Sequence, residues 1–242
     1  MGSTLLVHDD WLLTPEGAAI HAELATAVVA DLHLGYEWAR EAAGDCIPAH
    51  SLAEALDRLE RVLKHAPARR VVVAGDLVES HRPCARTRAD ALRLASWLAD
   101  RQVELVVLAG NHDLSLRESG IDPRSAAPLA EELEVGGWTI AHGHRPITGP
   151  RSISGHVHPV LCFEGATAPC FVVSSRMIVL PAFTNNAAGR DVASAPLPHA
   201  WARAQPRCIA CAGDQVIDLG PIDRLRPARR PTRNGRERQT RS

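Results

Sequence analysis

The chain of 242 residues has no hydrophobic run that approaches the ~18 apolar residues of a membrane-spanning helix. Its N-terminus reaches the polar residues His8 and Asp9 too early for the apolar segment of a secretory signal peptide. These two absences predict a cytoplasmic protein with no membrane partner. With 45% hydrophobic residues, the chain is long enough for one large globular domain with a sizeable core.

Cysteine is sparse, with six residues scattered along a chain too long to be a small disulfide scaffold. One pair, Cys208 and Cys211, has the C-x-x-C spacing of zinc and redox sites. No second C-x-x-C completes four ligands, and residues three apart in a strand face opposite sides of the sheet. Packing is therefore the favoured interpretation of this pair.

Lysine is almost absent, because Lys64 is the only lysine among 27 basic residues. Residues 224–242 hold eight arginines and one acid, a net charge of +7, so the remaining residues must sum to -8. Such a segment either tracks nucleic-acid phosphates or is a solvated extension of an arginine-rich protein. Because apolar periodicity is missing at this end, we predict one domain over residues 1–222 and a disordered Arg-rich tail over residues 223–242.

Strand and helix patterns alternate in the first half of the chain. Leucines at helical spacing predict one helix around Leu52–Leu63, with Ser51 as its N-cap, and a second around Leu92–Leu98. Apolar runs predict an opening hairpin and three buried strands. They cover Leu5–Val7, Trp11–Leu13, Thr26–Ala30, Arg70–Ala74 and Val103–Ala109.

The second half changes to short strands joined by Gly, Pro and Ser, with few helix signals after Glu134. A closing hairpin is predicted around the turn Gly213-Asp214. The whole pattern favours a sandwich of mixed sheets with helices outside. The strands expected before this hairpin are Trp138–Ala141, Ser152–Ser154, Phe171–Val173 and Met177–Leu180.

Five short polar motifs follow predicted strands, where ligands gather in α/β folds. A lone Asp-x-His or Gly-Asp pair is more often structural than metal-binding, but five such motifs in order predict a site for two metal ions. Mixed nitrogen and oxygen ligands suit Mn, Fe, Zn, Ni or Co better than Ca or Mg. The motifs are Asp31-Leu32-His33, Gly75-Asp76, Gly110-Asn111-His112-Asp113, Ala141-His142-Gly143 and Gly155-His156-Val157-His158.

Simple geometry connects some of these residues to a shared metal. In extended backbone the side chains of Asp31 and His33 point the same way, so both can reach one ion. The Asp76 carboxylate has two oxygens and can bridge two ions. His144, two residues after His142, is a rival ligand in the fourth motif.

The ordered motifs resemble the calcineurin-like metallophosphoesterase superfamily over about Ala30 to Pro159. The resemblance implies an α/β (α+β) fold, a four-layer αββα sandwich of two mixed β-sheets flanked by helices. Finer features resemble the small bacterial and archaeal branch that includes the ligase-associated DNA-damage-response nuclease. These features are Ala30–Gly35, Gly155–Pro159 and Leu180–Phe183.

The same resemblance implies the metal ligands. Two divalent ions are expected, manganese first and otherwise iron, zinc, nickel or cobalt, with Asp76 between them. The superfamily favours the first histidine of His-Gly-His, which selects His142 over His144. Asp31, His33 and His158 then hold the first metal, and Asn111, His142 and His156 hold the second.

Two further residues receive catalytic roles from the resemblance. His112 contacts the scissile phosphate without binding metal, and Asp113 orients His112. One departure is visible, because the superfamily often continues its second motif as Gly-Asp-x-x-Asp. Here Glu79 stands at the last of these positions, and it moves the carboxylate by one methylene.

These roles imply a metal-dependent phosphoric ester hydrolase in which a metal-bridged hydroxide attacks phosphorus. We expect a phosphodiesterase or nuclease, with a link to DNA repair and to DNA-repair partners by family resemblance only. A phosphomonoesterase acting on a small metabolite or phosphoprotein is the alternative, because both reactions use the same metals. A non-catalytic metal-binding scaffold is a third hypothesis, disfavoured because His112 and Asp113 are present.

Two residues near the motifs leave both interpretations open. Trp38 either stacks on a base or ring or packs in the core. Arg145 either clamps a substrate phosphate or is a solvated loop arginine.

Overall fold

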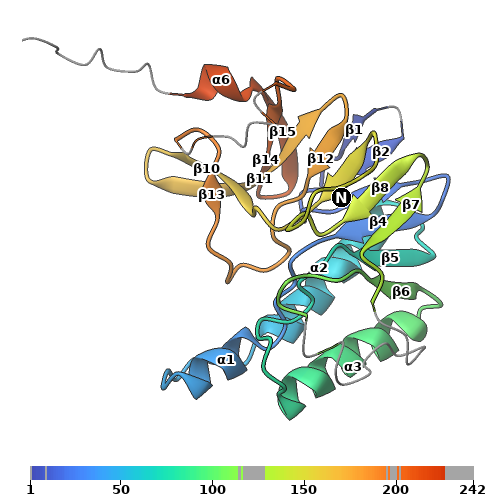
Figure 1. Cartoon of the computed structure of the whole chain (residues 1–242), viewed down its shortest axis with the longest axis vertical. Coiled ribbons are helices and arrows are strands. Elements are labelled where there is room, and N and C mark those ends of the chain that lie inside the picture. Colours follow the sequence, from blue (N-terminus) through green and yellow to red (C-terminus); the bar gives the residue numbers. More distant parts are fainter. Residues whose placement is uncertain are drawn as a thin grey trace, which may run out of the picture.

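Two mixed β-sheets pack face to face in the computed structural model (Figure 1). The model describes residues 2–226 except 9, 114–115, 117–128, 195, 197–200 and 202. Within these residues the first sheet is 6-stranded, in the order β1-β2-β3-β4-β5-β6. Its strands are β1 (Leu5–Val7), β2 (Trp11–Leu13), β3 (Ala19–His21), β4 (Thr26–Val29), β5 (Arg70–Val73) and β6 (Glu104–Val107).

The second sheet is 9-stranded within the described residues, with the order β13-β10-β11-β12-β9-β8-β7 and with β14 pairing with β11 and β15. The predicted closing hairpin is confirmed, because β14 and β15 pair antiparallel. The strands are β7 (Glu132–Val135), β8 (Trp138–Ala141), β9 (Ser152–Ser154), β10 (Pro159–Phe163), β11 (Ala166–Ser174), β12 (Met177–Val179), β13 (Arg190–Asp191), β14 (Arg207–Ala212) and β15 (Gln215–Pro221).

Period-two alternation in the central strands separates the two apolar layers. Val71 and Val73 of β5 pack toward the helices, whereas Val72 packs into the core between the sheets. Figure 1 shows α2 and α3 on the side of β4–β6 that faces away from β7 and β8. The helices are α1 (Tyr36–Ala42), α2 (Ser51–His65), α3 (Ala85–Ala99) and α6 (Ile222–Leu225).

The predicted helix around Leu52–Leu63 exists as α2, but its details differ from the expectation. Its most buried stripe is Ala55, Leu59 and Val62, and three of the four leucines that suggested the helix flank it as partly buried residues. Ser51 does not cap the helix, because the cap position is His50 and makes no side-chain cap hydrogen bond. The Ser51 hydroxyl instead accepts a hydrogen bond from the Gly35 backbone N–H at 3.2 Å.

The two mixed sheets confirm the predicted αββα sandwich, although the layer outside the second sheet is small. There α6 and a loop segment cover the sheet through Ile222, Val192 and Trp201. Residues 223–226 of the predicted tail directly follow the buried Ile222, and α6 extends to Leu225, while residues 227–242 lie outside the described residues. No helix among the described residues is both long and apolar enough to cross a membrane.

The C-x-x-C pair lies in β14, as the strand interpretation predicts. Cys208 packs in the outer core with Cys170, whereas Cys211 packs in the core between the sheets. Both thiols are buried on opposite faces, so they do not converge on a shared ligand.

The core between the sheets should dominate the stability of the fold. Phe171→Ala removes a fully buried ring from this core, so we expect it to lower the free energy of unfolding by about 3–5 kcal/mol. The matched control is Phe163→Ala, whose ring is 69% exposed and which should change stability by less than about 0.5 kcal/mol. Denaturant unfolding measures both, and equal effects would contradict the packing described here.

Candidate metal centre

The carboxyl ends of parallel strands from both sheets meet at one place. β4, β5 and β6 are parallel neighbours, and they are followed by the first three motifs. β8 and β9 are parallel neighbours in the second sheet, and they are followed by the last two motifs. Backbone hydrogen bonds continue into the loops, from Asp31 N to Gly75 O at 3.1 Å and from Gly155 N to His142 O at 3.1 Å.

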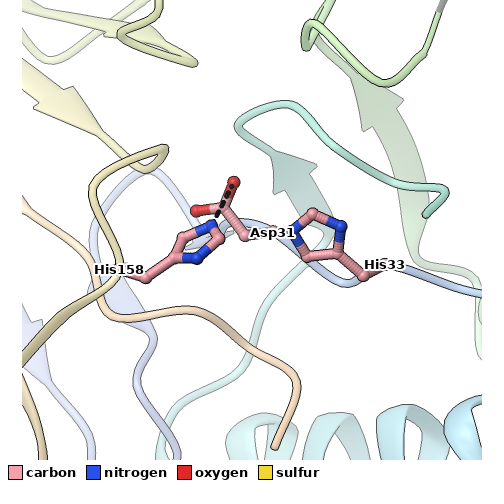
Figure 2. A group of neighbouring side chains, drawn as sticks. All are labelled: Asp31, His33 and His158. Atoms are coloured by element: carbon pink, nitrogen blue, oxygen red, sulfur yellow. Dashed lines mark ion pairs between the residues drawn. The ribbon is translucent and has the colours of Figure 1, made fainter. Parts of the chain in front are cut away.

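The first group of potential ligands is Asp31, His33 and His158, whose donor atoms all lie within 4.8 Å of one another. Figure 2 shows the His158 ring against the Asp31 carboxylate, where Nε2 lies 3.4 Å from Oδ1. Asp31 is fully buried, and its Oδ2 accepts a hydrogen bond from the His156 backbone N–H at 2.8 Å. The first predicted ligand set therefore converges, and Asp31 links the two sheets.

The second group is Asp76, His142 and His156, with donor atoms within the same 4.8 Å limit. The His142 Nε2 atom lies 3.0 Å from Asp31 Oδ1 and 3.3 Å from Asp76 Oδ2, so it is shared between two carboxylates. Asn111 is exposed at the start of the turn whose next residue, His112, donates its backbone N–H to Asp76 Oδ1 at 2.9 Å. Asn111 thus directly precedes a residue that is hydrogen-bonded to this group.

The third group, His33, Asp76 and His112, joins the other two. His33 belongs also to the first group and Asp76 also to the second. Potential ligand atoms therefore form one continuous cluster rather than two separate sites. His144 is in none of these groups, and its Nδ1 lies 3.0 Å from the Nδ1 of His142.

Burial and neighbouring charges shift the pKa values in this cluster in opposite directions. Burial alone would raise the pKa of Asp31, but hydrogen bonds and charge interactions with His142 and His158 hold that pKa well below its usual range. Burial alone would lower the pKa of His142, but Asp31 and Asp76 raise it to about 9. In the metal-free protein a proton on His142 therefore offsets the two negative charges.

Backbone strain is concentrated at the same residues. Non-glycine residues rarely adopt positive φ, and each such residue costs about 1–3 kcal/mol unless the surroundings enforce it. Half of the described non-glycine residues with positive φ are predicted metal ligands. They are Asp31 (φ 57), His33 (φ 49), Asp76 (φ 47), His156 (φ 68) and His158 (φ 48).

This finding corrects the geometric reason given for Asp31 and His33. The prediction assumed extended backbone, in which alternate side chains share one face. Both residues are instead in the left-handed region. Their ligand atoms still converge, but through a strained turn rather than a strand.

The glycines of the motifs make room for the ligands. A Cβ atom at Gly155 would collide with Asp31 Oδ2, and one at Gly110 would collide with Asp76 Oδ1. Any larger residue at these two positions would push a buried carboxylate away from the cluster. Gly110 and Gly155 are therefore packing requirements of the ligands that they face.

Glu79 supports two of the site histidines. Its carboxylate Oε2 lies 2.9 Å from His33 Nδ1, and its carbonyl oxygen is in very short contact with His112 Nδ1. The longer side chain that departs from the superfamily pattern thus still reaches a metal-site histidine. In the sequence, Glu79 stands out only as a departure from the superfamily motif. Nothing in the sequence indicates that its backbone carbonyl contacts His112.

Asp113 lies elsewhere than its expected role requires. Its oxygens accept backbone N–H groups, from Gly110 at 2.9 Å and from Val78 at 3.2 Å. Burial and the nearby Asp76 charge raise the pKa of Asp113 to about 6. The carboxyl is fully buried and ties the second motif to the third, whereas the His112 ring is oriented by the Glu79 carbonyl.

The residues fit a pair of divalent transition-metal ions. The His33 Nε2 atom is buried and has no hydrogen-bond partner within the described part of the chain, which is costly unless a ligand satisfies it. Imidazole nitrogens together with carboxylate oxygens form a donor set typical of zinc, manganese or iron. Arg145, by contrast, forms an exposed ion pair with Glu131 at 3.3 Å.

Comparisons with known proteins show what this chain is similar to. A family model described as calcineurin-like phosphoesterase matches residues 24–155, more than half of the chain. The DNA double-strand break repair protein Mre11 of Methanopyrus kandleri is 31% identical over 99 residues, which are 41% of this chain and 21% of that protein. The chain thus spans about a fifth of the length of this curated relative.

A solved structure shares the fold. The crystal structure of Pseudomonas putida nuclease MPE is similar with a TM-score of 0.67 and 21% sequence identity. The similarity covers 90% of this chain and 100% of that chain. At this level of identity the likeness concerns the fold.

The charges of the site predict pKa shifts in opposite directions for two neighbouring histidines in the metal-free protein. His142 should titrate at a pH of about 9, because it lies between two carboxylates. The pKa of His144 should lie below the ordinary 6.5, because burial and the His142 charge both oppose its protonation. NMR titration of the two rings measures this, and Asp31→Asn should lower the pKa of His142. Two rings that both titrate near 6.5 would contradict the described network.

Proposed function

The chain belongs to the calcineurin-like phosphoesterase family and is a metal-dependent phosphoester hydrolase, and from this we propose that it is a two-metal phosphodiesterase that cleaves nucleic acid. The family membership confirms the resemblance inferred from the five motifs. The observation that carries the proposal is the continuous ligand cluster, in which one group of three residues joins two others. A nuclease of similar fold and a repair protein of partly similar sequence support the choice of substrate.

We assign the ligands by the groups that converge, except Asn111, which is assigned from the family motif. Asp31, His33 and His158 would hold one ion, and Asp76 would lie between the two ions. Asn111, His142 and His156 would hold the other, with His142 preferred over His144 because only His142 reaches both carboxylates. When bound, two such ions supply Lewis acidity and lower the pKa of a shared water. Manganese is our first choice, with iron, zinc, nickel and cobalt as alternatives.

His112 is the residue placed to act on the phosphate. A carbonyl oxygen only accepts hydrogen bonds, so the contact with Glu79 O puts a proton on His112 Nδ1. Its Nε2 is then left for the substrate. The partly exposed ring lies in the group that joins the two others, so Nε2, when protonated, can stabilise charge on a phosphate oxygen or assist the leaving alkoxide.

The other functions are weighed against this one. A phosphomonoesterase would use the same ligands, and it is the second candidate because the cluster itself does not select diesters. A scaffold without activity leaves the partly exposed His112 unexplained. A link to DNA repair, DNA-repair protein partners, a cytoplasmic location and nucleic-acid binding by the Arg-rich tail over residues 223–242 stay predictions of the sequence.

The activity test uses the manganese-loaded protein and bis(p-nitrophenyl) phosphate, p-nitrophenyl phosphate and a single-stranded DNA. We expect the diester and the DNA to be cleaved in preference to the monoester. His112→Ala should lower kcat about 10²- to 10⁴-fold and leave the metal content unchanged, because His112 acts on the phosphate. His50→Ala, an imidazole outside the ligand groups, is the control. Loss of metal in His112→Ala would make His112 a ligand, and no turnover with any metal would refute the enzyme.

Glu79 provides a second test through metal binding. Glu79→Gln keeps the shape of the side chain but removes the charge beside His33 Nδ1. We expect metal affinity to fall about 10- to 100-fold, as when other outer partners of ligating histidines are removed. Glu164→Gln, at an exposed position, is the matched control. Competition with a chromogenic chelator measures the affinity, and an unchanged value would remove Glu79 from the site.

A further inference from the structure

A basic stretch begins directly after Glu79. Residues 80–88 contain three arginines and one histidine and no acid, although the chain outside residues 224–242 has a net charge of -8. The three arginines are Arg82, Arg86 and Arg88, and all are exposed. A local positive charge on an acidic body favours a polyanionic partner at this place.

The basic stretch forms one wall of a pocket of about 720 Å³, which we call the α1–α3 pocket. α1 supplies the other wall, with Trp38 and Glu41 among the lining residues. Its volume is within the roughly 300–1,000 Å³ of pockets that hold small ligands. The pocket can therefore accept a group of the size of a nucleotide.

Both walls of the pocket extend from metal-site loops. α1 begins at Tyr36, soon after the Asp31-x-His33 motif, and Ser80 follows Glu79, which contacts His33 and His112. The walls are held together tightly, because a Cβ atom at Gly35 would collide with Thr87 at the start of α3. A nucleic-acid strand that lies across the metal centre can thus continue into this pocket.

The lining chemistry suits a base and its phosphates. The Arg86 guanidinium lies 4.2 Å from the Trp38 ring centroid and pairs with Glu41 at 2.6 Å. Trp38 Nε1 donates to Asp90 at 2.8 Å, which fixes the ring plane in the wall. Single-stranded nucleic acids bind where aromatic rings stack on bases and arginines contact the backbone.

The pKa of one thiol is lowered at the same wall. Burial alone would raise the pKa of the Cys84 thiol, but hydrogen bonds from the Thr87 and Arg86 backbone and the Arg86 charge lower it. Cys84 lines the pocket at the start of α3. The pocket wall thus favours negative charge through hydrogen bonds as well as through Arg86.

We propose that the α1–α3 pocket binds a single-stranded nucleic acid next to the scissile phosphate, with Trp38 stacking on a base and with Arg82 and Arg86 on phosphates. This inference rests on the proposed phosphodiesterase function and specifies its substrate. The occupant is the substrate strand itself, because the pocket adjoins the metal-site loops and carries the opposite charge.

The test measures binding of a fluorescent single-stranded oligonucleotide by anisotropy. All variants are full-length and metal-loaded and carry His112→Ala, so that residues 227–242 stay constant and cleavage is slowed. Trp38→Leu should raise Kd about tenfold through lost stacking. The double variant Arg82→Ala/Arg86→Ala should also raise Kd, and it should reduce the slope of log Kd against log salt by about 0.7 for each lost phosphate contact.

The chain offers a matched control at the other end of α3. Arg101 lies 3.8 Å from the Trp97 ring centroid and pairs with Glu60 at 3.3 Å, the same combination of contacts away from the pocket. Arg101→Ala should leave Kd and its salt dependence unchanged. With His112 restored, Arg101→Ala should also hydrolyse bis(p-nitrophenyl) phosphate at the parent rate, because Arg101 lies outside both the pocket and the metal centre.

The outcomes separate the two proposals. If the Trp38 and arginine variants bind the oligonucleotide as tightly as Arg101→Ala does, the pocket proposal is wrong even when the small diester is hydrolysed. If the parent protein hydrolyses no diester, the proposed function fails, and the binding comparison still decides the pocket. The double arginine variant changes only exposed side chains, so it keeps the test valid if Trp38→Leu does not fold.

Discussion

Two buried carboxylates with one imidazole between them are the constraint around which this site is built. Asp31 and Asp76 are almost completely buried, and His142 Nε2 lies 3.0 and 3.3 Å from their oxygens. Burying such charges is costly unless they are paired and hydrogen-bonded. Backbone N–H groups of His112 and His156 complete this pairing from two different sheets. In the metal-free protein, a proton on His142 offsets the negative charge that divalent metal ions offset in this family.

Several features of the fold follow from keeping these carboxylates in place. Left-handed backbone at Asp31 and Asp76 turns them inward, and glycines opposite them provide the space. Asp113 ties the second motif to the third through backbone N–H groups. Glu79 then uses its side chain for His33 and its carbonyl for His112, and the next residues form the wall of the α1–α3 pocket. The loop around Glu79 thus connects the metal ligands, the residue that contacts the phosphate and the pocket proposed for the nucleic-acid strand.

The sequence predicted the parts of the structure that depend on local pattern. The continuous apolar run around Val72 located a central strand, and the motifs after the strands located the ligand groups. It did not predict what depends on distant partners. Ser51 bonds to Gly35 instead of capping its own helix, Asp113 accepts backbone N–H groups instead of orienting the His112 ring, and β10 begins at a proline that carries no strand signal. Tertiary contacts decide each of these.

The most direct test of the account is a crystal structure of the manganese-loaded protein with anomalous scattering measured at the manganese edge. The account predicts two peaks, about 3.5–4 Å apart, with the Asp76 carboxylate between them and His112 bound to neither. A single ion, or two ions that share no ligand at Asp76, would contradict the two-metal site on which the proposed function rests.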